Sequence, residues 1–94
     1  MKKIVPKDKK QAAALQYDAS RDAAPVITAL GQGLVAEKII EKAKENEVPV
    51  VENKGLSQML QALSTGDVIP PKLYEAVANI FVFIFEMDQK YKGR

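Results

Sequence analysis

Two kinds of residue pattern in this chain could support chemistry, and the first is a pair of glycines. Gly31 and Gly33 lie between a predicted strand and a predicted helix, where backbone N–H groups can bind phosphate. A dinucleotide fingerprint requires a third glycine at position 36, which is alanine here, a residue that is sometimes allowed. A tight strand-to-helix turn is the simpler interpretation, and nucleotide binding stays as the minor alternative.

The second pattern consists of two carboxylate pairs, Asp18/Asp22 in a polar loop and Glu41/Glu45 on a helix face. The chain contains no histidine and no cysteine to work with them. Histidine is the side chain most used for proton transfer near neutral pH, and cysteine thiolates serve as nucleophiles and metal ligands. We therefore predict that the protein is not an enzyme and has no catalytic residue, metal site or cofactor. The lack of cysteine also fits a reducing, cytoplasmic location.

Length and composition predict one small folded domain. The chain has 94 residues, of which 47% are hydrophobic and 28% charged, as in ordinary globular proteins. The longest uninterrupted apolar run, at 80–85, is far shorter than the roughly 20 residues of a membrane-spanning helix. We expect no direct insertion into a membrane.

The net charge of +2 is unevenly distributed along the chain. Residues 1–10 carry a net charge of +4 and residues 90–94 a net charge of +3, so the intervening body is acidic. We interpret 1–10 and 91–94 as basic tails around a single domain at 11–90. An alternative is that the tails bind RNA, although basic groups on nucleic-acid-binding proteins usually cluster on a folded face.

The elements that must position these residues follow from hydrophobic periodicity and from Gly and Pro. Strands are expected at 11–17, 26–31 and 48–51, with a short additional strand at Ile4-Val5 before Pro6. Helices are expected at 34–46, 55–64 and 71–88, the second of them capped by Asn53. The first two main strands should be antiparallel, and the strand–helix–strand order predicts a parallel pair next. The fold class is α/β, a small three-layer domain with a mixed three- to four-stranded sheet flanked by three helices.

Several strings in this order resemble the cytoplasmic domain of the FlhB/YscU family of type III export proteins. They are ALQYD (14–18), Ala24-Pro25, Gly31, VPVVENKGL (48–56) and GDVIPPKLYEAVANI (66–80), and the resemblance covers residues 12–85. The resemblance implies a module of flagellar or related protein export that helps to recognise export substrates or to switch export specificity. It implies export-gate components, early export substrates and the transmembrane portion of a full-length homologue as partners. The protein would reach the inner face of the plasma membrane only by binding that machinery.

The chain departs from the family where full-length members cleave themselves, within an Asn-Pro-Thr-His segment. The corresponding residues here are Lys7, Asp8, Lys9 and Lys10, so the asparagine nucleophile and the following proline are missing. The family's transmembrane portion is missing as well. The chain therefore resembles a stand-alone copy of the fragment that cleavage releases, and we expect it not to cleave itself.

The resemblance also implies a small hydrophobic patch that docks a short apolar export signal, at Ala24, Pro25, Ala78 and Phe81. Ala78 and Phe81 are three residues apart on one predicted helix and share a face. The alternative is that Ala78 and Phe81 are ordinary core residues. Aliphatic residues are common in relatives at position 81, so the bulkier Phe81 could fill the dent beside Ala78.

A second predicted contact surface consists of Glu52, Asn53 and Lys54, which follow a strand's C-terminal end. The alternative there is a helix N-cap with charged neighbours. As a whole, the sequence favours an interaction module of protein export, with an RNA-binding module that uses basic termini as the alternative function.

Overall fold

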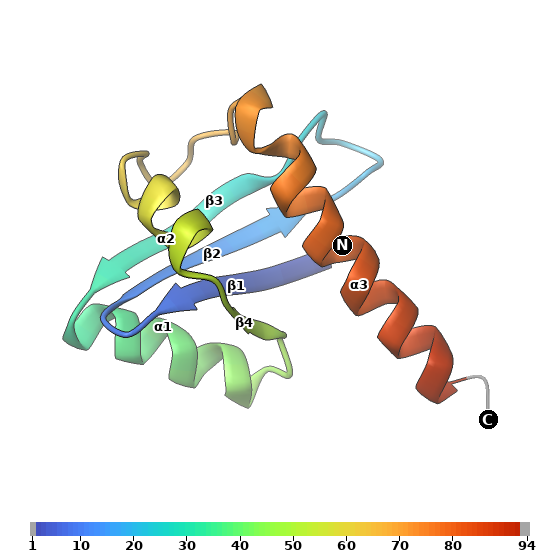
Figure 1. The fold of residues 1–94 in the computed structure, drawn as a ribbon, viewed down its shortest axis with the longest axis horizontal. Coiled ribbons are helices and arrows are strands. Elements are labelled where there is room, and N and C mark those ends of the chain that lie inside the picture. Colours follow the sequence, from blue (N-terminus) through green and yellow to red (C-terminus); the bar gives the residue numbers. More distant parts are fainter. Residues whose placement is uncertain (1, 93–94) are drawn as a thin grey trace.

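The computed structural model describes the backbone of residues 2–92 and the side chains of residues 2–84. A four-stranded mixed sheet forms the middle layer, as Figure 1 shows, and confirms the predicted α/β class. Helix α1 covers one face of the sheet, and α2 and α3 pack on the other. The strands are β1 (Lys2–Asp8), β2 (Gln11–Tyr17), β3 (Val26–Gln32) and β4 (Val50–Glu52). The helices are α1 (Leu34–Glu45), α2 (Lys54–Gln61), the 3₁₀ turn η1 (Pro71–Leu73) and α3 (Tyr74–Lys92).

The strand order in the sheet is β3-β2-β1-β4. The β1–β2 and β2–β3 pairs are antiparallel, as expected for β2 and β3, and β4 is parallel to β1. The predicted neighbour for β4 was β3, and that pairing is wrong. The reason is that β1 and β2 occupy the two positions between β3 and β4, so α1 crosses the sheet to reach its far edge.

Strand β1 is the largest correction to the sequence analysis. We expected residues 1–10 to be a basic tail with a strand stub at Ile4-Val5, but residues 2–8 form a full strand in the interior of the sheet. The Val5 N–H donates to the Pro49 carbonyl at 2.9 Å, so alternation turns Pro6 toward β2, where its missing N–H interrupts the ladder. Burial on both faces of the sheet compensates, because Ile4, Val5 and Pro6 are all buried.

The two faces of the sheet alternate along β1 and β2. Ile4 and Leu15 point to the α2/α3 side, whereas Val5 and Ala12 point to the α1 side. Both sides are covered by helices, which explains why the QAAALQY run of β2 is apolar at successive positions. On the outer edge of β3, residues 66–69 add backbone hydrogen bonds, including Ile27 N–H to the Asp67 carbonyl at 2.8 Å.

The conformation of the turn between β3 and α1 explains why residues 31 and 33 are glycines. Gly33 has φ +58°, in the left-handed region that favours glycine. At Gly31 a side chain would clash, because an added Cβ would lie 2.9 Å from Val35 Cβ and 3.1 Å from the Ala36 nitrogen. The pair therefore permits a tight turn and brings α1 close to the sheet.

Helix boundaries mostly follow local signals. Asn53 caps α2 as predicted, because its Oδ1 accepts the Leu56 N–H at 3.1 Å. Helix α2 ends at Gln61, three residues before the predicted end at 64. The N–H of Leu63 bonds the Leu60 carbonyl, three residues back, which tightens and ends the helix.

The helix predicted at 71–88 begins as η1 at Pro71 and continues as α3 to Lys92. The predicted C-terminal tail at 91–94 is therefore helical at 91–92, and residues 93–94 lie outside the described part of the chain. Within that part, no helix is long and apolar enough to cross a membrane.

Candidate functional site

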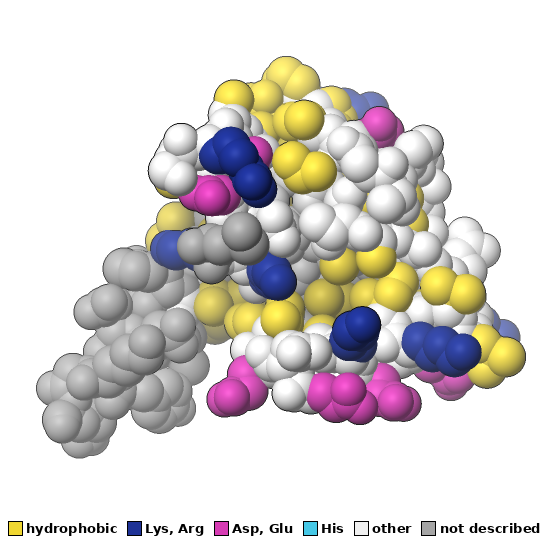
Figure 2. Space-filling model, turned by 180° about the vertical axis from the view of Figure 1, so that it is seen from behind, with side chains coloured by type: hydrophobic (Ala, Val, Ile, Leu, Met, Phe, Trp, Pro, Cys, Tyr) yellow, Lys and Arg dark blue, Asp and Glu magenta, His cyan; other side chains and the backbone are white. Residues whose placement is uncertain are grey.

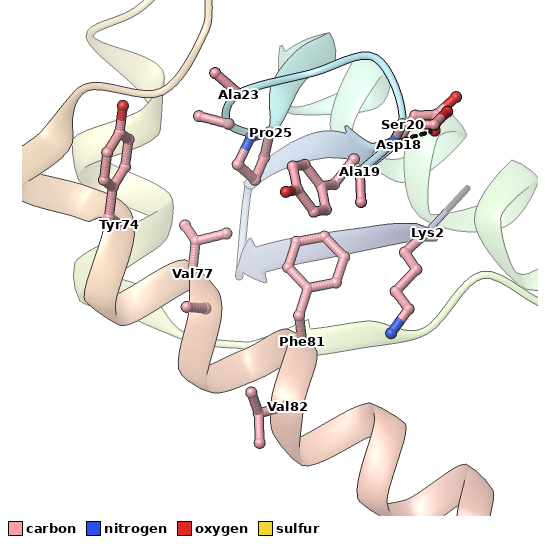
Figure 3. Close-up of a pocket in the computed structure, with 13 residues that line it drawn as sticks. Lys2, Asp18, Ala19, Ser20, Ala23, Pro25, Tyr74, Val77, Phe81 and Val82 are labelled. Carbon is pink, nitrogen blue, oxygen red and sulfur yellow. Dashed lines mark hydrogen bonds between the residues drawn. The ribbon is translucent and has the colours of Figure 1, made fainter.

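An apolar groove of about 730 Å³ runs between α3 and the loop that joins β2 to β3. Figure 3 shows Tyr74, Val77, Phe81 and Val82 on the helix side, with Pro25 across from them. From Tyr74 to Phe81 the helix advances seven residues, about 10 Å at 1.5 Å per residue. The groove is therefore long enough for a short peptide segment, beyond a single side chain.

All four residues of the predicted hydrophobic patch line this one groove. Ala24 and Pro25 come from the β2–β3 loop and Ala78 and Phe81 from α3, 53 or more positions later in the chain. Ala24 is buried, Pro25 and Phe81 are half-buried, and Ala78 is exposed. The alternative that both are ordinary core residues is wrong for Ala78, which is exposed, whereas Phe81 packs against the hydrophobic core and also lines the groove.

The Phe81 ring packs against a second aromatic ring and does not fill the groove. Its centroid lies 6.3 Å from that of Tyr17, at the end of β2, with the two planes tilted by 52°. This distance and tilt are within the range of favourable aromatic pairs. Tyr17 therefore supports the Phe81 ring, and both rings line the groove.

Hydrogen bonds order the loop that forms the opposite wall. Asp18 Oδ1 accepts the Ser20 hydroxyl at 2.6 Å and the Ser20 N–H at 3.0 Å, while Asp22 Oδ2 accepts the Asp18 N–H at 3.1 Å. Arg21 forms an ion pair with Asp22 at 3.7 Å. The Ser20 hydroxyl, the Ser20 N–H and the Arg21 charge lower the pKa of Asp18 from its ordinary value of 3.8. The carboxylates of Asp18 and Asp22 thus stabilise the conformation of this loop.

Sequence reasoning did not include three of the large side chains that line the groove, Tyr17, Tyr74 and Val82. Tyr74, Ala78 and Phe81 have i, i+4, i+7 spacing, so the helix pattern alone could have indicated Tyr74. Nothing local indicates Tyr17, because its contact with Phe81 spans most of the chain.

The second predicted surface lies elsewhere. The Asn53 N–H donates to the Lys7 carbonyl at 2.8 Å, whereas the groove is lined by Lys2, at the other end of β1. Lys2 and Lys7 are five positions apart along the strand, a distance of about 17 Å. Glu52 and Lys54 are exposed, and Asn53 forms the cap that the alternative interpretation described.

The glycine turn and the described acidic residues give little support for a phosphate site or a metal site. The Gly33 N–H donates to the Lys10 carbonyl at 2.8 Å, and the next two side chains, Leu34 and Val35, are exposed and apolar. That surface does not suit a phosphate. Among the described residues, no group of three or more His, Cys, Asp or Glu side chains is placed to hold a metal ion.

Comparison with known proteins identifies similar chains. The family model described as "FlhB HrpN YscU SpaS Family" matches residues 4–84. The Bacillus subtilis (strain 168) protein YlqH, described as uncharacterized, is 42% identical over 85 residues, which are 90% of this chain and 91% of YlqH. The flagellar biosynthetic protein FlhB of Aquifex aeolicus (strain VF5) is 40% identical over 80 residues. Those residues are 84% of this chain but only 23% of the Aquifex protein.

A solved structure is similar over nearly the whole chain. The crystal structure of the cytoplasmic domain of FlhB from Shewanella putrefaciens superposes with a TM-score of 0.91 at 33% sequence identity. The match covers 97% of this chain and 71% of that one. The fold described above is therefore the fold of that domain.

Proposed function

The chain belongs to the FlhB HrpN YscU SpaS family, and from that membership we propose that it is a non-enzymatic interaction module of flagellar or related type III protein export. Its fold is that of an FlhB cytoplasmic domain. The specific role that we propose is to dock the apolar signal of early export substrates, and so to take part in substrate recognition or specificity switching. The partners would be those substrates, export-gate components and the transmembrane portion of a full-length homologue.

The observation that carries this proposal is the groove itself. Residues from two distant parts of the chain combine into an apolar surface that stays open beside Phe81. Ala78 contributes only a methyl group to the lining, one helical turn from the larger Tyr74 and Phe81, and Pro25 lies across the groove from α3. An aliphatic or aromatic side chain of a docked peptide would lose water in the groove, which is the usual basis of an anchor residue.

The experiment is an NMR titration of the isotope-labelled protein with the N-terminal segment of an early export substrate. We expect shifts to cluster at Ala24, Ala78 and Phe81, and we expect Phe81→Asp to abolish them. Phe83→Asp is the matched control, because Phe83 is on the same helix, 62% exposed and not part of the groove lining. Equal binding by both variants would contradict the proposal, provided that both spectra retain the dispersion of a folded protein.

We propose a separate contact for the exposed loop residues Glu52 and Lys54, with a component of the export gate. Their distance from the groove makes the two surfaces independently testable. The double variant Glu52→Ala/Lys54→Ala is expected to keep substrate-peptide binding and to weaken co-purification with export-gate components. A loss of peptide binding in this variant would contradict the division into two surfaces.

We further propose that the chain does not cleave itself. Lys7 and Asp8 end β1, and Lys9 and Lys10 form the turn to β2, so no asparagine side chain lies in this segment to attack the backbone. Intact mass after prolonged incubation at mildly alkaline pH is expected to show one species. A defined break near residue 7 would overturn this proposal.

No observation favours the RNA-binding alternative. Residues 2–8, which carried part of the predicted basic tail, are a strand of the sheet. Short RNA in the same NMR titration is the test, and shifts confined to the lysines would support it.

A further inference from the structure

The α1 side of the sheet carries a second hollow, a cleft of about 500 Å³ between α1 and the strands β1, β2 and β3. Its floor is made of small and aliphatic side chains, among them Ala14, Ala29 and Ile39. The cleft exists because alanine side chains are too short to fill the space beside α1, whose side chains Ala36 and Ala43 are also small. Ala14, Ala29 and Ile39 are half-buried, so the floor is open to an incoming group.

Charge around this cleft is of one sign. Lys3, from the sheet, and Lys42, from α1, line it, and no described carboxylate does. Residues 39, 42 and 43 of α1 line the cleft together with the C-cap residue Asn46, and these positions share one helix flank. Glu37, Glu41 and Glu45 recur every four residues on the opposite flank. Figure 2 views this face. Acidic side chains lie along the lower edge of the molecule, and basic side chains lie between this acidic row and a band of hydrophobic side chains.

We propose that this cleft docks a peptide segment of a partner protein in which acidic residues alternate with aliphatic ones. Aliphatic side chains would cover the apolar floor, and carboxylates would reach the ammonium groups of Lys3 and Lys42 on the two banks. The same basic groups could attract an anionic bilayer, but a flat bilayer cannot follow a recessed floor. The cleft lies on the opposite face of the sheet from the groove, so this proposal stands apart from the proposed function.

The test is an NMR titration of the full labelled chain with a capped eight-residue peptide that alternates glutamate with leucine. A second peptide with lysine in place of glutamate measures the charge requirement. We expect saturable shifts at Ala14, Ala29 and Ile39 with the glutamate peptide, and at least tenfold weaker binding of the lysine peptide. Vesicles of phosphatidylglycerol and phosphatidylcholine are the third probe, for which no binding is expected.

The deciding variant is Lys3→Glu/Lys42→Glu, which reverses both charges that line the cleft. We expect this variant to weaken binding of the glutamate peptide at least tenfold and to improve binding of the lysine peptide. Lys44→Glu is the matched control, because Lys44 is on α1 but does not line the cleft. Equal effects of the two charge changes, equal binding of both peptides, or binding of the vesicles in place of the glutamate peptide would overturn the proposal. A dispersed spectrum of each variant shows that the fold is kept.

Discussion

The two faces of the sheet are packed in different ways. On the α2/α3 face the buried side chains are large, with Ile4, Leu15, Ile27 and Leu60 at most 1% exposed. On the α1 face most of the buried side chains are alanines, and α1 approaches closely over Gly31. Because hydrophobic stabilisation grows with buried apolar area, the first face carries more of the stability. The second face instead depends on small residues, which permit close approach in one place and leave a cleft in another.

The largest expected effect is on the face with large side chains. Leu60→Ala removes a side chain that is 0% exposed, and should lower the free energy of unfolding by about 2–5 kcal/mol. Met59→Ala, at the neighbouring and 46% exposed position, should cost no more than about 1 kcal/mol. Urea unfolding of both variants gives the comparison. Similar costs at the two positions would mean that this core is not the main source of stability.

On the alanine face, the informative change adds volume. Gly31→Ala places a methyl group against Val35 and the backbone of α1, and should destabilise the protein by about 1–3 kcal/mol. Gly55→Ala is the control in α2, where an added Cβ has its nearest neighbour at 3.9 Å, so about 0.4–1 kcal/mol of stabilisation is expected. Urea unfolding should therefore give changes of opposite sign. A neutral Gly31→Ala would show that α1 can move away from β3 at little cost.

The third effect compares a helix end on each face. Asn53→Ala removes the cap of α2 and should cost about 1 kcal/mol. Asn46→Ala, at the end of α1, removes a hydrogen bond from Nδ2 to the Lys42 carbonyl at an exposed site and should cost less. Thermal unfolding measures both, and Asn53→Ser should restore most of the α2 cap. A larger loss of stability for Asn46→Ala than for Asn53→Ala would contradict the expectation that the helix end on the α2/α3 face contributes more.

The smallest effect concerns the loop beside the groove. Because the pKa of Asp18 is lowered in the folded protein, the stabilisation from its hydrogen bonds to Ser20 is fully present above pH 3.8 and is lost as the pH falls from there through the lower pKa of the folded state. The Ser20 amide resonance should therefore move on acidification, and Asp18→Asn should remove that dependence. A Ser20 amide that titrates identically in the variant would assign the change to another group.

Much of the helical part of the fold could be predicted, because helices depend on local spacing. The 3.6-residue period of α1, the Asn53 cap and the prolines before α3 each act within a few residues of where they stand. The grouping of Ala24, Pro25, Ala78 and Phe81 was also predicted, but through resemblance to a family. Residue spacing by itself predicted only that Ala78 and Phe81 lie on the same face of one helix.

By itself, then, the sequence determined which segments become helices, that Asn53 caps the second of them, and that histidine and cysteine chemistry is absent. Only the tertiary structure decided that residues 2–8 form an interior strand, that β4 pairs with β1, and that Tyr17 supports Phe81. The physical reason is the range of the interactions involved. A lysine-rich segment interrupted by proline has weak intrinsic preference for a strand, and it becomes one because both of its faces are buried by elements that come later in the chain.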